Sequence, residues 1–140
     1  MAVRIFEAKD QYVEEIKKHF ESAIKFFEKG RALVDTDPVQ ASEKLYKSVE
    51  EIIKGLAKYY EFRDILDRVG ERGRWTTKDL DKAAIKISEK LGDWFRRAWE
   101  TAYYLHVEGF HEARLDQSEV EVRVGDIERL VNEIKRIISL

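Results

Sequence analysis

Apolar residues recur every three or four positions along most of this sequence, and this period is the feature that most constrains the fold. Between Asp10 and about Val34 the apolar residues that recur at steps of three, four or six are Tyr12, Ile16, Phe20, Ala23, Phe27 and Leu33. An α-helix turns once in about 3.6 residues, so these side chains share one face. Only seven Gly and one Pro interrupt the 140 residues. The sequence therefore predicts an all-α fold, with one domain over residues 1–140 built as an antiparallel bundle of about five helices.

A break follows the first predicted helix at Asp37 and Pro38. Asp is a favoured N-cap and Pro is tolerated in the first turn, so a second helix is expected to start there. Its apolar stripe comprises Leu45, Val49, Ile52, Leu56 and Tyr60, and the period continues through Phe62, Ile65 and Val69. We therefore expect this helix to run to about Val69.

The segment from Gly70 to Thr76 is the clearest loop in the sequence, because two Gly interrupt the helical pattern. Thr76 or Thr77 can cap a third helix, whose stripe comprises Leu80, Ala84, Ile87 and Leu91.

Gly92 is expected to end the third helix, Asp93 to cap a fourth, and Gly109 to close that one. The fourth stripe comprises Phe95, Ala98, Trp99, Ala102, Leu105 and His106. The second and fourth stripes are the most regular. We therefore predict as core residues Leu45, Val49, Ile52, Leu56, Ala98, Trp99, Ala102 and Leu105.

The start of the last helix is left open by the sequence. Ser118 with Glu121 resembles a capping box, and Asp126 offers a second start before a run of Ile, Leu and Val. Val120, Val122 and Val124 alternate, so a short extended segment before Asp126 is the alternative.

Composition excludes several classes of function. The 26 basic and 28 acidic side chains nearly cancel, so no global field would attract DNA or an anionic membrane. The absence of Cys excludes disulfides, thiol catalysis and thiolate metal sites. No apolar run approaches the roughly 20 residues of a membrane span, and residues 1–6 lack a signal-peptide layout. We expect a cytoplasmic protein, and the scarcity of Asn, Gln, Met and Cys favours a thermophilic source.

The histidines do not predict a metal site or a catalytic pair. His106 and His111 lie five positions apart, which on a continuous α-helix separates their directions by about 140°, and Gly109 lies between them. His106 is expected to be a buried neutral imidazole with a hydrogen-bond partner, although a catalytic base is the alternative. His19 is expected at the boundary of the first helix's core face. No nucleophile elbow or phosphate-binding glycine motif is present, and no cofactor is predicted.

One loop gathers cations beside an aromatic ring. Arg72, Arg74 and Trp75 are candidate ligand-binding residues, because cations hold phosphates and a flat indole can stack on a base. The alternative is a solvated helix end with Trp75 folded back on the bundle.

Three blocks of sequence, in order, resemble the archaeal PaREP family. They are Ala41-Ser-Glu-Lys-Leu-Tyr-Lys-Ser-Val-Glu-Glu-Ile-Ile-Lys-Gly-Leu-Ala57, Arg74-Trp-Thr76 and Ala102-Tyr-Tyr-Leu-His-Val-Glu-Gly-Phe-His-Glu-Ala-Arg-Leu-Asp116. That family resembles the HEPN-like helical bundles, a superfamily that includes ribonuclease toxins and partners of nucleotidyltransferases. The resemblance implies a HEPN-like bundle of archaeal origin.

The ribonuclease members of that superfamily carry Arg, four to six residues, then His on one helix. This sequence departs from the pattern, because Arg96 and Arg97 precede His106 by nine and eight intervening residues and His111 has no Arg in that window. The catalytic pair is therefore not carried over. Arg96, Arg97, His106 and His111 remain candidate ligand-binding residues.

We therefore predict a non-catalytic binding or regulatory module with a nucleic acid, a nucleotide or a second protein as its partner. A diverged HEPN-type ribonuclease is the alternative. Adjacent aromatic residues form four pairs: Phe26-Phe27, Tyr59-Tyr60, Trp94-Phe95 and Tyr103-Tyr104. Neighbours on a helix point about 100° apart, so these pairs predict a second apolar surface and hence a homodimer.

Overall fold

The computed structural model describes residues 10–138 and is helical almost throughout. Its elements are α1 (Asp10–Leu33), α2 (Pro38–Tyr59), α3 (Arg63–Arg72), α4 (Thr77–Leu91), α5 (Asp93–Tyr104), the π-helix η2 (Leu105–His111) and α6 (Gln117–Ile138). No strand occurs within residues 10–138, which confirms the predicted all-α class.

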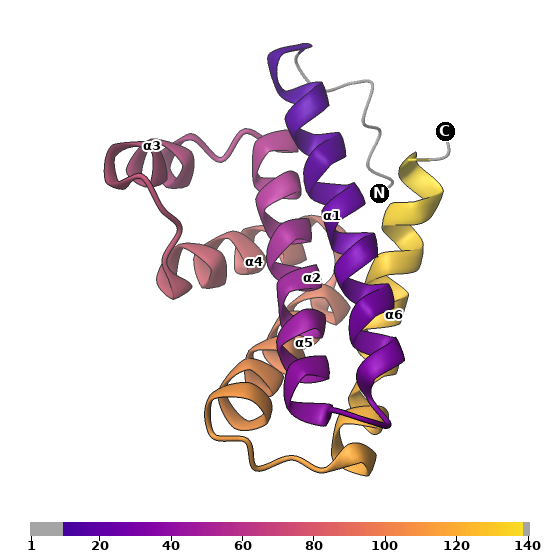
Figure 1. Cartoon of the computed structure of the whole chain (residues 1–140). Helices are drawn as coiled ribbons and strands as arrows, with labels where there is room; N and C mark the ends of the chain where they lie inside the picture. Colours follow the sequence, from indigo (N-terminus) through magenta and orange to yellow (C-terminus); the bar gives the residue numbers. More distant parts are fainter. Residues whose placement is uncertain (1–9, 139–140) are drawn as a thin grey trace.

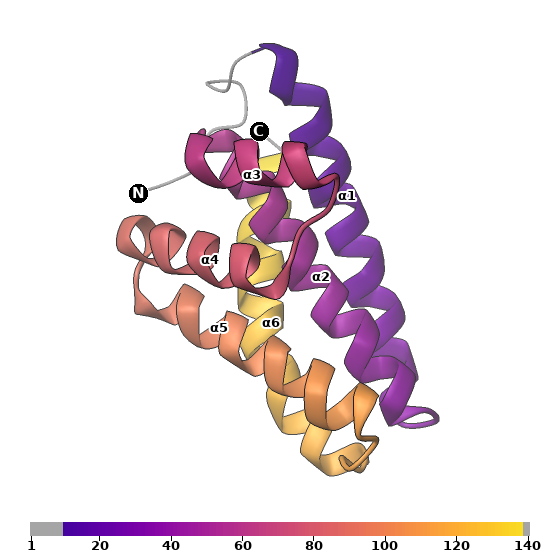
Figure 2. The same cartoon turned by 90° about the vertical axis from the view of Figure 1, so that its left-hand side faces the viewer.

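The helices pack around α2. The antiparallel pair α1 and α2 forms one side of the bundle, and α6 packs against both of them (Figure 1). The α4–α5 pair lies across another side of α2 (Figure 2), and η2 continues from α5 to pack on α2 as well. The short helix α3 stands away from the body and packs on α4 and α2 (Figure 1).

The core occupies the space where these helices meet. All eight predicted core residues are buried, namely Leu45, Val49, Ile52, Leu56, Ala98, Trp99, Ala102 and Leu105. Burying one such aliphatic side chain contributes roughly 1.5–3 kcal/mol, so the two regular stripes supply much of the driving force for folding.

The local capping signals at Asp37 and Thr76 act where the sequence predicted them, whereas the signal at Asp93 does not. Asp37 accepts a hydrogen bond from the backbone N–H of Gln40 (3.1 Å) and starts α2. Thr76 and Asp79 form a capping box at the start of α4. Asp93 does not cap α5, however, because Gly92 holds the cap position and Asp93 is the first helical residue.

The predicted continuation of the second helix to Val69 is wrong. The chain leaves α2 at Tyr60, and Glu61 adopts a left-handed conformation (φ 55°). The N–H of Phe62 donates to the carbonyl of Ala57 (3.0 Å) and that of Glu61 to Lys58 (3.2 Å), the two bonds of a Schellman motif. Such a turn favours Gly, so a Glu at this position gave no signal. The structure therefore has six α-helices and η2 within its described residues.

The last helix begins at Gln117, close to Ser118 rather than Asp126. Its capping residue is Asp116, whose side chain accepts from the N–H of Glu119 (2.9 Å) while Glu119 accepts from the N–H of Asp116 (3.1 Å). The extended alternative is wrong, since Val120, Val122 and Val124 all lie within α6.

None of the helices described, in residues 10–138, combines the length and apolar character that crossing a membrane requires.

Candidate functional site

The π-helix η2 shapes the candidate site. Gly109 was predicted to close the fourth helix, but the helical chain runs on through it to His111. The N–H of Glu112 donates to the carbonyl of Val107, five residues earlier, at 2.9 Å. Short π-helices of this kind occur frequently at functional sites.

The wider turn brings His106 and His111 together. Their Nε2 atoms are 3.1 Å apart. The prediction that the two rings diverge assumed an α-helix, in which positions five apart do not overlie each other. In a π-helix the backbone bonds join residues i and i+5, so both imidazoles lie on one face.

Glu43 of α2 completes what we call the histidine site, which consists of Glu43, His106 and His111. The Nδ1 atom of His106 lies 2.8 Å from Oε1 of Glu43. His106 therefore has the predicted hydrogen-bond partner, but it is not fully buried, because its side chain is 20% exposed and that of Glu43 14%. His111 is exposed.

The ring of His106 lies within a row of aromatic side chains. It stacks on Tyr46 with 4.0 Å between centroids, and it contacts Tyr103 (6.1 Å) and Phe110 (6.4 Å). Burial raises the pKa of the Tyr46 phenol, and the carboxylates of Glu50 and Glu43 raise it further. Tyr46 is therefore a neutral platform that fixes the plane of His106.

Gly109 lets η2 approach α2 closely enough for these contacts. A Cβ added at Gly109 would lie 2.2 Å from Oγ of Ser42 and 2.6 Å from its Cβ. Ser42 is itself buried and donates to the carbonyl of Pro38 (2.8 Å), so it cannot turn aside without losing that bond. Because Glu43 follows Ser42, this close packing sets the distance between Glu43 and His106.

The hydrogen-bond network assigns the protons of the histidine site. A carboxylate only accepts, so Nδ1 of His106 donates to Glu43. In the neutral ring, the Nε2 atom of His106 carries a lone pair, which faces Nε2 of His111. The nearby carboxylates of Glu108 and Glu112 are held by the guanidinium of Arg114, at 2.8 and 3.4 Å.

The structure does not join the candidate arginines of α5 to the histidine site. Arg96 and Arg97 are exposed on α5, and neither is hydrogen-bonded to the described side chains of His106 or His111. Arg96 shares a face of α5 with Tyr103, since seven residues make nearly two turns.

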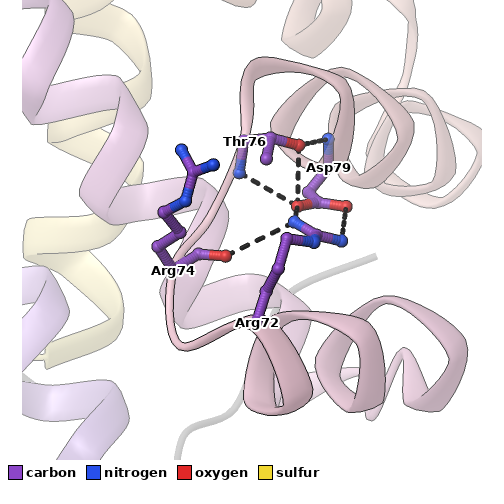
Figure 3. Close-up of polar contacts among 4 residues, drawn as sticks. All are labelled: Arg72, Arg74, Thr76 and Asp79. Atoms are coloured by element: carbon purple, nitrogen blue, oxygen red, sulfur yellow. Dashed lines mark hydrogen bonds and ion pairs between the residues drawn. The ribbon is translucent and has the colours of Figure 1, made fainter.

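The basic loop, with Arg72, Arg74 and Trp75, joins α3 to α4 at the side of the bundle, away from η2 (Figures 1 and 2). Arg72 donates to Asp79 (2.6 Å) and to the carbonyl of Arg74 (3.4 Å), while the guanidinium of Arg74 points away from this cluster (Figure 3). Trp75 is half-buried against the core. Hydrogen bonds from Arg72 and Thr76 hold the pKa of Asp79 well below its usual range. Arg72 is thus committed to an internal ion pair.

An open hollow of about 280 Å³ lies beside the basic loop, lined by Arg68, Glu71 and Arg72.

His19 lies at the edge of the core face of α1, as predicted, and is held by two partners from α2. Its Nδ1 atom is 2.6 Å from Glu51 and its Nε2 atom 3.0 Å from Lys58.

Sequence reasoning missed Glu43, Tyr46 and Ser42 as parts of the site. All three lie on α2, about sixty positions before the residues of η2 that they contact, so no local pattern joins them. The spacing of His106 and His111 around Gly109 was the available signal, but its meaning depends on the type of helix.

The fold and the histidine site together define a small all-helical bundle protein with a paired-imidazole surface. The chain belongs to the archaeal PaREP1/PaREP8 family, whose family model matches residues 11–131. It is similar to a Sulfolobus solfataricus protein of known crystal structure, with 34% identity and a TM-score of 0.75, over 85% of this chain and 98% of that one. A solution structure of the same structural-genomics target gives 36% identity and a TM-score of 0.71, over 84% of this chain and 91% of that one. No curated protein matches the chain.

Proposed function

We propose that this chain is a HEPN-like binding module that works as a homodimer and takes a nucleotide or single-stranded nucleic acid at the histidine site. The observation that carries this proposal is the row of rings with polar edges at one surface. Tyr103 is 38% exposed and His111 is exposed, with the ring of Phe110 5.2 Å from that of His111.

Two physical properties of this surface suit such a ligand. Bases stack on exposed aromatic rings with little regard to sequence, and imidazole N–H groups can donate to phosphate or base oxygens. Arg96 and Arg97 are exposed earlier on α5 and can neutralise neighbouring phosphates. The basic loop is a weaker candidate, because Asp79 already neutralises Arg72.

Fluorescence anisotropy with labelled single-stranded RNA tests this proposal. Binding is expected to weaken as salt rises, and to fall in Tyr103→Ala and in the double variant of Arg96 and Arg97 to Ala. Arg74→Ala is the matched control, since it removes an exposed cation from the loop between α3 and α4, away from the histidine site. If binding falls only in the Arg74 variant, the basic loop is the site and the proposal is wrong.

The homodimer rests on a smaller apolar surface than the sequence implied. Phe27 and Phe95 are buried, and Phe26, Tyr59, Tyr60 and Trp94 are half-buried, so three aromatic pairs are largely covered within the chain. Tyr104 and Val122, in contrast, are exposed on the surface of the single chain, Val122 to 74%. The guanidinium of Arg123 lies 4.5 Å from the ring of Tyr104, so these two residues share a surface of α5 and α6, and Val122 precedes Arg123 on α6. A second copy of the chain would cover it.

A diverged ribonuclease is a second candidate, favoured by the chain of contacts from Glu43 through His106 to His111. A carboxylate that orients one imidazole, which in turn contacts a second, is an arrangement suited to proton transfer. Incubation with end-labelled RNA tests it, since cleavage should occur and should be lost in His106→Ala. The absence of cleavage, or cleavage unchanged in that variant, contradicts this candidate.

A further inference from the structure

We propose that His106 and His111 together bind a divalent transition metal ion through their Nε2 atoms, with Glu43 orienting His106 from behind. The proposal does not rest on nucleic-acid binding, because the metal alone is its ligand. It contradicts the sequence-based prediction, whose geometric ground was the divergence of the two rings.

The separation of the two nitrogens fits a shared ion. The Nε2 atoms are 3.1 Å apart. Two imidazole nitrogens, each about 2.0–2.1 Å from a tetrahedral zinc ion, lie roughly 3.3 Å from each other. The two rings meet at 83° with 4.4 Å between centroids, so the exposed His111 ring has to turn for both lone pairs to aim at one ion.

Glu43 supplies the support that metal-binding histidines ordinarily have. A ligating imidazole usually donates its other ring N–H to a carboxylate, which fixes its tautomer and its orientation. Glu43 lies 2.8 Å from Nδ1 of His106, so in the neutral ring the proton is on Nδ1 and the Nε2 lone pair can bind a metal ion. The stacking of His106 on Tyr46, at 4.0 Å between centroids, fixes the ring plane.

The rest of the coordination shell determines what kind of site this is. No group of three or more His, Asp or Glu in the described part of the chain is placed to hold an ion. The protein therefore supplies two nitrogens, and water or oxygens of a bound molecule supply the remaining ligands, as in an open site. Imidazole favours Zn²⁺, Ni²⁺, Co²⁺ or Cu²⁺ over Mg²⁺ or Ca²⁺.

The competing arrangement is a direct hydrogen bond, with the Nε2–H of His111 donated to Nε2 of His106. Without metal this bond holds the rings together. When the ion binds, the ring proton of His111 moves through solvent from Nε2 to Nδ1, so the imidazole stays neutral and its Nε2 lone pair is available to the metal. The two arrangements differ in their response to metal, so titration separates them.

Isothermal titration calorimetry of the untagged full chain with Zn²⁺, Ni²⁺ and Mg²⁺ tests the proposal. Zn²⁺ and Ni²⁺ are expected to bind at one ion per chain, with no heat from Mg²⁺. Affinity should fall at least tenfold in His111→Gln, and on the order of 10–100-fold in Glu43→Gln, because the loss of a supporting carboxylate has effects of that size.

His19→Gln is the matched control, since His19 also contacts a carboxylate but faces Lys58 through its other nitrogen. It should retain wild-type metal affinity. His111 is exposed, so its variant is expected to fold normally, which circular dichroism checks. The absence of Zn²⁺ and Ni²⁺ binding by the wild type, or equal affinity in the His111 and His19 variants, overturns the proposal. RNA binding measured in a chelator reports separately on the proposed function.

Discussion

Gly109 and Ser42 form the contact on which the histidine site depends. The absence of a side chain at Gly109 lets η2 lie against Ser42 on α2, and Glu43 is the next residue along that helix. The requirement for glycine at this position is steric, because a Cβ would overlap Ser42. It is not conformational, because Gly109 does not have a positive φ. The consequence for stability can be measured at this one position.

Gly109→Ala is expected to destabilise the fold by on the order of 1–3 kcal/mol, because the new Cβ overlaps Ser42 and forces η2 outward. Urea denaturation measures this loss. Gly125→Ala is the control, since that glycine lies in α6 with open space around it, and Ala there should raise stability by about 0.5–1 kcal/mol. Equal effects of the two substitutions would show that the close approach is not steric.

The ion pair of Arg72 with Asp79 predicts a dependence on pH. Because the pKa of Asp79 is lowered in the folded state, its stabilising contribution is complete above the unfolded pKa, near 4, and is lost as the pH falls further. Arg72→Ala should therefore lower the melting temperature clearly at pH 7, and the difference from wild type should shrink below about pH 4.

Arg74→Ala serves as the control for this prediction, since its guanidinium points away from Asp79 (Figure 3). It should leave the melting temperature nearly unchanged across the same pH range. A pH-independent loss in the Arg72 variant would indicate a packing role in place of the ion pair.

At the scale of the element, two departures from regular α-helix shape the molecule. The Schellman motif at Glu61 separates α3 from α2 and directs the chain to the side of the bundle (Figure 1). The π-helix η2 brings the side chains of His106 and His111 onto the same face. Both departures occur where the apolar period alone suggested an α-helix.

Glu61→Gly and Glu61→Ala form a matched pair that tests the first departure. Both remove the carboxylate, but only Gly adopts a positive φ without steric cost. The Gly variant should be more stable than the Ala variant by about 1 kcal/mol in urea denaturation. If the Ala variant is equally stable or more so, Glu61 is not held in the left-handed conformation in solution.

For the whole molecule, stability rests on the core that α2 organises. Leu56 has no exposed surface, so Leu56→Ala should cost on the order of 2–5 kcal/mol in urea denaturation. Val122→Ala is the control at a 74% exposed position of α6 and should cost little. A loss below about 0.5 kcal/mol for Leu56→Ala would contradict its place in the core.

The proposed homodimer is tested by size exclusion with light scattering. The mass should be twice the 16.6 kDa of one chain at micromolar concentration. Val122→Glu should shift it toward one chain, because a charge on the apolar contact surface opposes association. A wild-type mass near 16.6 kDa that does not change on concentration contradicts the dimer.

The sequence by itself determined the features that depend on neighbouring residues. The apolar period located the core of α2 and α5, and the caps at Asp37 and Thr76 act through hydrogen bonds that span three positions. Such interactions are present in any helix with these residues, so local patterns predict them.

Only the tertiary structure decided where the helices depart from their regular course and which residues meet. Packing of the buried Phe62 favours the turn at Glu61 over a longer helix. The contact of Gly109 with Ser42 holds η2 against α2, and this places Glu43 beside His106 across about sixty positions of sequence. The same packing of η2 on α2 accompanies the contact between the rings of His111 and His106. These outcomes depend on surfaces brought together by folding, and no periodicity within one segment encodes them.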